Sequence, residues 1–139
     1  MPNKLILLPL IVQVLLTMAL YVALAVAKAK SLKDGTVDLS RRALYEDAWP
    51  KNVQQINNSI KNQFQLPVLF YVLIIVLYEI GQVHAWIQAL AWLFVASRAI
   101  HAKIHTGSNV VPARRAVFTF GCVVLAVLIG IAGWVIVTA

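Results

Sequence analysis

Hydrophobic and polar positions along the chain alternate in long blocks: extended apolar runs are separated by short polar segments rich in Lys and Arg. The first apolar run covers about residues 5–27, and only Gln13 and Thr17 interrupt it. Crossing a hydrocarbon layer of roughly 30 Å takes about 20 helical residues, and nothing in the sequence alternates with the period of a barrel strand. The pattern therefore predicts membrane-spanning helices, which satisfy their backbone hydrogen bonds internally.

Two of the later apolar runs are too short to span the membrane alone, so their helices must include neighbouring polar turns. The second run begins after the polar residues 58–65, and Pro67 predicts a kink in its helix. The third is apolar only to about Ala96, Gly107 to Asn109 end its helix, and Pro112 suits the start of the fourth. We predict one domain over residues 1–139, an all-α membrane protein built as a bundle of four transmembrane helices, with spans at about 5–27, 62–80, 83–105 and 115–137.

Composition agrees with this prediction and changes how the charge is interpreted. Hydrophobic residues make up 61% of the chain and charged residues 12%, and the mean hydropathy is +0.82, which is too apolar for a soluble domain of this size. A pI near 9.9 would suggest nucleic acid in a soluble protein. Here the cations flank the apolar runs, so we expect membrane lipids as partners and no nucleic acid.

The distribution of cations also predicts the topology. Of the twelve Lys and Arg residues, seven lie in residues 28–61 and four in residues 98–115, and only Lys4 lies elsewhere. Four spans would put the two basic segments, with eleven cations in total, on one side of the membrane. By the positive-inside rule this side is cytoplasmic and both termini face outward. In a bacterium the protein would be a multi-pass protein of the inner membrane.

The polar residues near the cytoplasmic side form two stripes. Asn62 and Gln65 share one face of the second predicted helix, and Arg98, His101 and His105 share one face of the third, because helical neighbours recur three and four residues apart. Such groups can simply bind phosphates or a neighbouring helix. A cavity lined by cations and amides would instead select an anionic ligand. We expect no metal, since neither a Cys nor a carboxylate cluster joins the two His residues.

Three motifs together resemble the bacterial branch of the MAPEG family, the membrane-associated proteins in eicosanoid and glutathione metabolism. They are Asn62-Gln-Phe-Gln65-Leu-Pro67 at the start of the second span, Arg98-x-x-His101 in the third, and Arg114 sixteen residues after Arg98. The resemblance covers nearly the whole chain. It implies a homotrimer of four-helix subunits, with glutathione as cofactor bound between neighbouring subunits at the cytoplasmic side.

The resemblance also implies roles for single residues. Arg114 would be the catalytic residue that stabilises the thiolate of glutathione. A free thiol with a pKa of about 8.5 is mostly protonated at neutral pH, and a nearby guanidinium favours the anion. The other expected cofactor-binding residues are Asn62, Gln65, Arg98, His101, His105 and Arg115. Among them, the cations would bind the two carboxylates of glutathione.

The chain departs from the family pattern at several of these positions. Gln65 stands where the family has Glu, which removes a charge that could hold the amine of glutathione. Asn58 replaces an Arg one turn before Asn62, and His105 and Phe118 occupy positions where eukaryotic members often carry Tyr. These differences bear on glutathione chemistry and leave the expected fold unchanged.

We predict a membrane-bound glutathione-dependent transferase or peroxidase that acts on a lipophilic small molecule, either an electrophile or a lipid hydroperoxide. The alternative is a non-catalytic structural or accessory subunit with the same fold, packed into a larger membrane complex. A small transporter or channel is less favoured, because no predicted span carries a charge near its middle.

Overall fold

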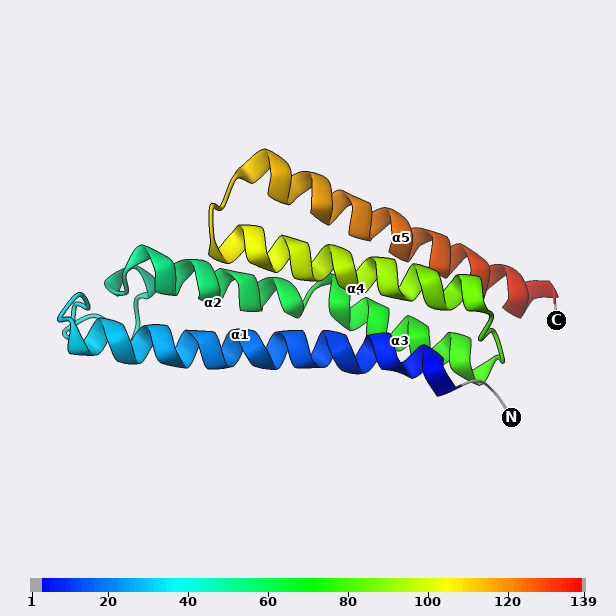
Figure 1. Cartoon of the computed structure of the whole chain (residues 1–139), viewed down its shortest axis with the longest axis horizontal. Coiled ribbons are helices and arrows are strands. Elements are labelled where there is room, and N and C mark those ends of the chain that lie inside the picture. Colours follow the sequence, from blue (N-terminus) through cyan, green and yellow to red (C-terminus); the bar gives the residue numbers. More distant parts are fainter. Residues whose placement is uncertain (1–3, 139) are drawn as a thin grey trace.

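The computed structural model describes residues 4–138, and its elements form an elongated helical bundle (Figure 1). Two short 3-10 helices, η1 and η2, accompany the α-helices. The first described turn and the end of α5 lie at the same end of the bundle (Figure 1). In chain order the elements are η1 Lys4–Ile6, α1 Leu7–Lys33, η2 Glu46–Ala48, α2 Lys51–Gln63, α3 Leu66–Glu79, α4 Ala85–Thr106 and α5 Val111–Thr138.

Three helical stretches within residues 4–138 are long and apolar enough to cross a membrane: Lys4–Lys33, Lys51–Glu79 and Val111–Thr138. The second of these joins α2 and α3. Helix α4 has 22 residues but carries polar groups in its last turns, including the buried Arg98 and His101, which lower its hydropathy. The chain is thus an all-helical membrane protein, and a fourth crossing by α4 stays a prediction.

The second predicted span, 62–80, contains a break. A kink was predicted at Pro67, and the break lies just before this residue. Helix α2 ends at Gln63 and α3 begins at Leu66, so the chain bends before Pro67. Proline has no N–H to donate to the carbonyl of Gln63, and its ring crowds that carbonyl. The intervening amides turn to nearer acceptors: Phe64 N–H donates to Lys61 O at 3.2 Å and Val68 N–H to Gln65 O at 3.2 Å.

The other helix boundaries differ from the predicted spans by several residues. Helix α1 continues to Lys33, beyond the predicted end at residue 27, and stops before Gly35, whose φ of +67° is left-handed. Helix α5 begins at Val111 rather than at residue 115. Both differences lie in polar turns, because a helix does not end where its apolar run ends.

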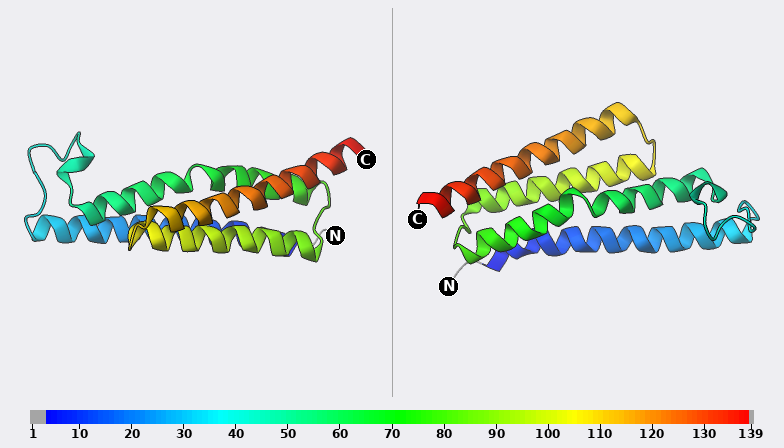
Figure 2. Two further views of the ribbon diagram at one scale, coloured as in Figure 1. Left: turned by 90° about the horizontal axis from the view of Figure 1, so that it is seen from above. Right: turned by 180° about the vertical axis from the view of Figure 1, so that it is seen from behind.

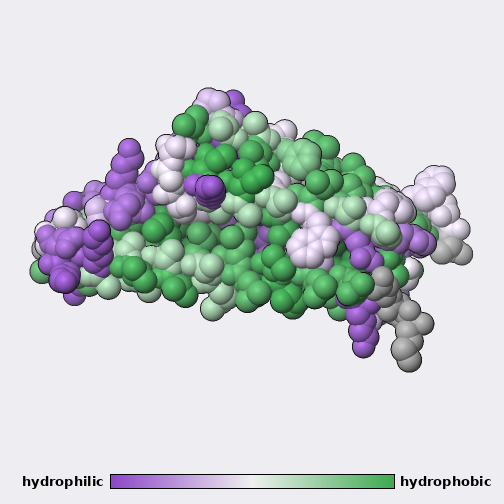
Figure 3. All heavy atoms as spheres, in the orientation of Figure 1, coloured by the Kyte–Doolittle hydropathy of each residue, from purple (hydrophilic) through white to green (hydrophobic). Residues whose placement is uncertain are grey.

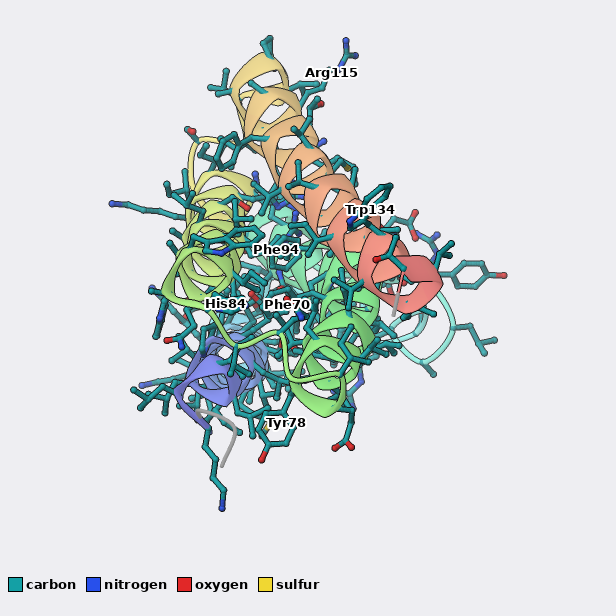
Figure 4. All side chains as sticks on the ribbon, turned by 90° about the vertical axis from the view of Figure 1, so that its right-hand side faces the viewer. Phe70, Tyr78, His84, Phe94, Arg115 and Trp134 are labelled. Atoms are coloured by element: carbon teal, nitrogen blue, oxygen red, sulfur yellow. The ribbon has the colours of Figure 1, made fainter. Side chains whose placement is uncertain are left out.

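Helices α2 and α3 together form one bent rod that lies along α1, while α4 and α5 form an antiparallel hairpin beside them (Figure 2). The main apolar core joins α3, α4 and α5. At its centre Phe70 and Phe94 stack with ring centroids 4.4 Å apart, between the helices (Figure 4). A second core cluster of Leu20, Leu24, Val53, Ile60 and Ala102 packs α1 and α2 against α4.

The outside of the bundle is also largely apolar. Large hydrophobic side chains such as Leu15, Val22 and Val123 are more than half exposed. Hydrophilic residues gather at the end formed by residues 34–50, whereas the middle of the visible face is mostly hydrophobic (Figure 3). A surface of this kind belongs in lipid rather than in water.

Candidate functional site

A cavity of about 310 Å³ lies where α2, α4 and the start of α5 meet. Four of its lining residues were predicted as site residues from the sequence, and they come from three different helices. Helix α2 contributes its last turn, α4 its polar end and α5 its first two turns. The lining consists of Asn62, His101, Val111, Arg114, Arg115 and Phe118.

Arg114 is held at this cavity by the turn between α4 and α5. Its Nη1 donates a hydrogen bond to Oδ1 of Asn109, and its backbone N–H donates to Val110 O at 3.0 Å. Asn109 adopts a left-handed φ of +53°, a conformation that Asn tolerates better than most residues, and its N–H caps α4 by donating to Ile104 O at 2.7 Å. The turn therefore fixes both the start of α5 and the guanidinium of Arg114.

Asn109 is a functional candidate that reasoning from sequence missed. It was identified only as part of the segment that ends a helix. Asn in a Gly-Ser-Asn turn is the kind of residue that adopts positive φ, but that preference does not show that its side chain faces an arginine five residues later.

Arg98 is fully buried, with 0% exposure, and does not line the cavity. Its Nη2 lies 3.4 Å from Nδ1 of His101, and its guanidinium carbon lies 5.6 Å from the ring centroid of Phe118. Its Nε and Nη1 have no hydrogen-bond partner within residues 4–138. Arg98 thus lies behind His101 and Phe118, which line the cavity. It is a buried cation whose hydrogen-bond donors are only partly used.

The two histidines of α4 lie next to each other. Their rings meet edge to face with centroids 5.6 Å apart. His101 lines the cavity, whereas His105 is buried and outside its lining, and no partner within the described chain bonds its Nδ1. Over residues 4–138 no three His, Cys, Asp or Glu side chains gather as metal ligands would.

The two predicted amides of the second span have different environments. Asn62 lines the cavity, although its Nδ2 already donates to Asn58 O at 2.9 Å on its own helix. Gln65 is exposed at the break between α2 and α3 and is not part of the lining. The break changes the direction of the chain, so the spacing of three that put both residues on one helical face no longer applies.

Of the seven predicted site residues, the cavity brings four together: Asn62, His101, Arg114 and Arg115. Arg98 and His105 lie behind the wall, and Gln65 lies outside. No carboxylate is among the lining residues. Two guanidinium groups without a neighbouring acid give the cavity a positive potential, which favours an anionic ligand.

The fold and the cavity define a class: a small helical membrane protein with a cavity lined by two arginines where α2, α4 and α5 meet. The model of the MAPEG family matches residues 6–134, nearly the whole chain. The chain belongs to the MAPEG family, whose members are associated with glutathione-related transferase and eicosanoid chemistry in membranes. No curated protein and no solved structure gives a significant match to the chain.

Proposed function

We propose that the protein is a glutathione-dependent transferase or peroxidase of the membrane, acting on lipophilic electrophiles or lipid hydroperoxides. The observation that carries this proposal is the cavity in which Arg114, Arg115, His101 and Asn62 converge without a carboxylate. Within a MAPEG chain, that arrangement suits a peptide with two carboxylates and an ionisable thiol.

The residues at the cavity fit glutathione in three respects. Arg114 and Arg115 can each donate charge-assisted hydrogen bonds to a carboxylate or a thiolate. The Oδ1 of Asn62 remains free to accept a hydrogen bond from a peptide N–H, because only its Nδ2 bonds Asn58. Arg98 keeps two nitrogens without a partner within residues 4–138, and a bound anion beyond His101 and Phe118 would stabilise this buried cation.

Arg114 is the proposed catalytic residue. Bound glutathione would supply a thiol nucleophile for addition to an electrophile or for reduction of a hydroperoxide. A guanidinium held by Asn109 keeps its position when the ligand arrives, so less side-chain entropy is lost on binding. Lowering the pKa of a thiol by two units takes only about 2.7 kcal/mol of preferential interaction with the thiolate, which one well-placed guanidinium can provide.

An apolar hollow on the α4–α5 hairpin, separate from the Arg114 cavity, supports a lipophilic second substrate. It has a volume of about 370 Å³ and lies between α4 and α5, with Leu93, Ile100, Val117 and Phe120 in its lining. Leu93, Ile100 and Phe120 are about half exposed on the outside of the bundle. A hydrophobic substrate could therefore reach the α4–α5 hairpin from the bilayer without crossing water.

A second candidate function is that of a non-catalytic subunit in a larger membrane complex. It is favoured by the position of Gln65, which carries no charge and lies outside the cavity. With no carboxylate in the lining, the ammonium group of glutathione has no ionic partner among the residues that line the cavity.

We infer further that the active form is a homotrimer in the bacterial inner membrane, with the basic segments cytoplasmic and both termini outward. A neighbouring subunit in such an assembly would bring its own polar groups near the cavity and could supply the missing partner for the ammonium. The eleven cations in residues 28–61 and 98–115 support this orientation.

Binding and turnover distinguish the two functions. Glutathione is titrated calorimetrically into the purified protein in detergent micelles, and conjugation to 1-chloro-2,4-dinitrobenzene is measured in parallel. We expect binding and turnover in the native protein, and a loss of about tenfold or more in kcat/KM for Arg114→Ala, since a hydrogen bond to a charged group contributes roughly 1.5–3 kcal/mol.

Lys103→Ala is the matched control, because Lys103 is an exposed cation in the last turn of α4 outside the cavity. This variant should retain native kcat/KM. If the native protein binds no glutathione, the enzymatic proposal fails and the accessory role is favoured. Binding without conjugation or peroxidase turnover would leave only the non-catalytic role.

A further inference from the structure

A second cavity, of about 300 Å³, lies apart from the proposed glutathione site. It forms between the connector of residues 34–50 and the facing parts of α1 and α2. None of its lining residues lines the first cavity. The lining residues that bear on its chemistry are Lys28, Arg42, Leu44, Tyr45, Glu46 and Trp49.

The cavity presents positive charge that is not neutralised by its one acidic residue. Lys28 and Arg42 line it, and neither forms an ion pair within residues 4–138. Nζ of Lys28 lies 4.8 Å from the ring centroid of Trp49, which holds it at the cavity by a cation–π contact. Glu46 is the one acid in the lining, and Nζ of Lys61 bonds its Oε1 at 2.5 Å. Two cations therefore remain available for an anion.

The cavity also lies where the apolar run of α1 meets the polar connector. Lys28 is the first charged residue after the apolar run of α1, and hydrophilic residues gather at the end of the molecule formed by the connector of residues 34–50 (Figure 3). Trp and Tyr side chains such as those of Trp49 and Tyr45 favour the membrane–water interface. Leu44, on the cavity rim, is 85% exposed, and Leu39 on the same connector is 67% exposed. Exposed leucines beside unpaired cations are an arrangement that lipid, rather than water, would stabilise.

We propose that this cavity binds the headgroup of an anionic phospholipid. Lys28 and Arg42 bind the phosphate, and Tyr45 and Trp49 lie beside the glycerol and headgroup region. Leu44 inserts between the acyl chains. A free phosphate ion would meet the same two cations, but it would make no use of Leu44, and this difference separates the two sources of the anion. The site is independent of the proposed glutathione chemistry.

Native mass spectrometry tests the site on the full-length protein in detergent. Phosphatidylglycerol and phosphatidylcholine with identical acyl chains are titrated separately, and the bound fraction is measured. We expect the native protein to prefer phosphatidylglycerol by about tenfold or more, because each cation near an anionic lipid contributes roughly fivefold in affinity. Lys28→Gln combined with Arg42→Gln should abolish this preference.

Lys30→Gln combined with Lys33→Gln is the matched control, since it removes two cations from the same helix end outside the cavity lining. It should keep the preference within about twofold, because charge at a distance is screened by salt. Equal losses in both double variants, or no preference in the native protein, would overturn the proposal. If circular dichroism shows that the first double variant does not fold, Arg42→Gln alone decides: a loss of about fivefold supports the site and no loss overturns it.

Two further measurements identify the source of the anion. Leu44→Ser should weaken retention of phosphatidylglycerol severalfold and leave the binding of glycerol phosphate unchanged. If millimolar glycerol phosphate or inorganic phosphate displaces the lipid completely, and Leu44→Ser has no effect, the cavity binds a free phosphate and the lipid proposal is wrong.

Discussion

A hydrogen bond between two buried glutamines joins α1 to the end of α2. Nε2 of Gln13 donates to Oε1 of Gln63 at 2.8 Å, and the two side chains are 0% and 1% exposed. Gln63 is the last residue of α2 and the neighbour of Asn62, so this bond fixes the rotation of the helix just before the break. We predict that replacing either glutamine by leucine destabilises the protein more than replacing both.

The magnitude follows from what each variant leaves behind. Oε1 of Gln13 has no partner within residues 4–138, so Gln63→Leu leaves a fully buried amide without a side-chain partner, at a cost of about 1–3 kcal/mol. Gln13→Leu leaves Oε1 of Gln63 unsatisfied in the same way. The double variant has no orphaned amide at this contact. Hydrogen bonds between membrane helices show coupling energies of about 0.6 kcal/mol on average and up to about 1.7 kcal/mol. The double variant is less destabilised than either single variant only if the coupling exceeds each single cost, so we expect single costs of about 1 kcal/mol and a coupling in the upper part of this range.

A double-mutant cycle measures the coupling. The four proteins are unfolded by sodium dodecyl sulfate in mixed micelles, and helix content is followed by circular dichroism. A control cycle pairs Gln13→Leu with Gln65→Leu, because Gln65 is exposed at the break and should show a coupling near zero. Strictly additive costs for Gln13 and Gln63, within about 0.3 kcal/mol, would refute the idea that this bond orients α2.

Two further variants test the α4–α5 hairpin. Gly121→Val should destabilise the fold by about 1–3 kcal/mol, because a Cβ at Gly121 would lie 3.1 Å from Oγ of Ser97 on α4. Gly130→Val is the control, since nothing lies within 4 Å of a Cβ there. It should lower the free energy of unfolding far less in the same assay. Arg98→Met should leave the unfolding free energy unchanged or higher, since a poorly paired buried charge contributes little to stability. The same variant should weaken glutathione binding severalfold, because a buried positive charge behind His101 and Phe118 attracts an anion in the cavity without touching it. Lys103→Met should weaken neither property. Full retention of binding by Arg98→Met would show that Arg98 does not contribute to the site.

The apolar pattern was sufficient to predict the class of fold and the order of the helices. Long runs of apolar residues have few structural solutions in a membrane, so residues 5–27 and 115–137 were easily identified as helices. The ends were less accurate. Helix α1 continues through Lys28 and Lys30, because alanine, leucine and lysine propagate a helix well regardless of the apolar boundary.

The sequence predicted which residues lie in the same region of the bundle, but not which side chains contact one another. Four of the seven predicted residues line one cavity, and their role in binding stays a prediction. Helical spacing did not reveal that α2 breaks before Gln65, since proline acts on the carbonyl four residues earlier. It also did not reveal that Asn109 holds Arg114, which depends on the backbone conformation of a short turn.

We propose that the cavity at Arg114 binds glutathione and stabilises its thiolate. Ultraviolet absorbance of the thiolate on purified protein, at neutral pH and with glutathione bound, tests it most directly. A thiol with a pKa of about 8.5 is roughly 3% ionised at pH 7, and a decrease of two units raises this to roughly 75%.

We predict a strong thiolate absorbance for the native protein and its loss in Arg114→Ala, with Lys103→Ala behaving like the native protein. A native protein that shows no thiolate absorbance in the presence of saturating glutathione would contradict this proposal. Thiolate absorbance that persists in Arg114→Ala would show that a group other than Arg114 stabilises the anion.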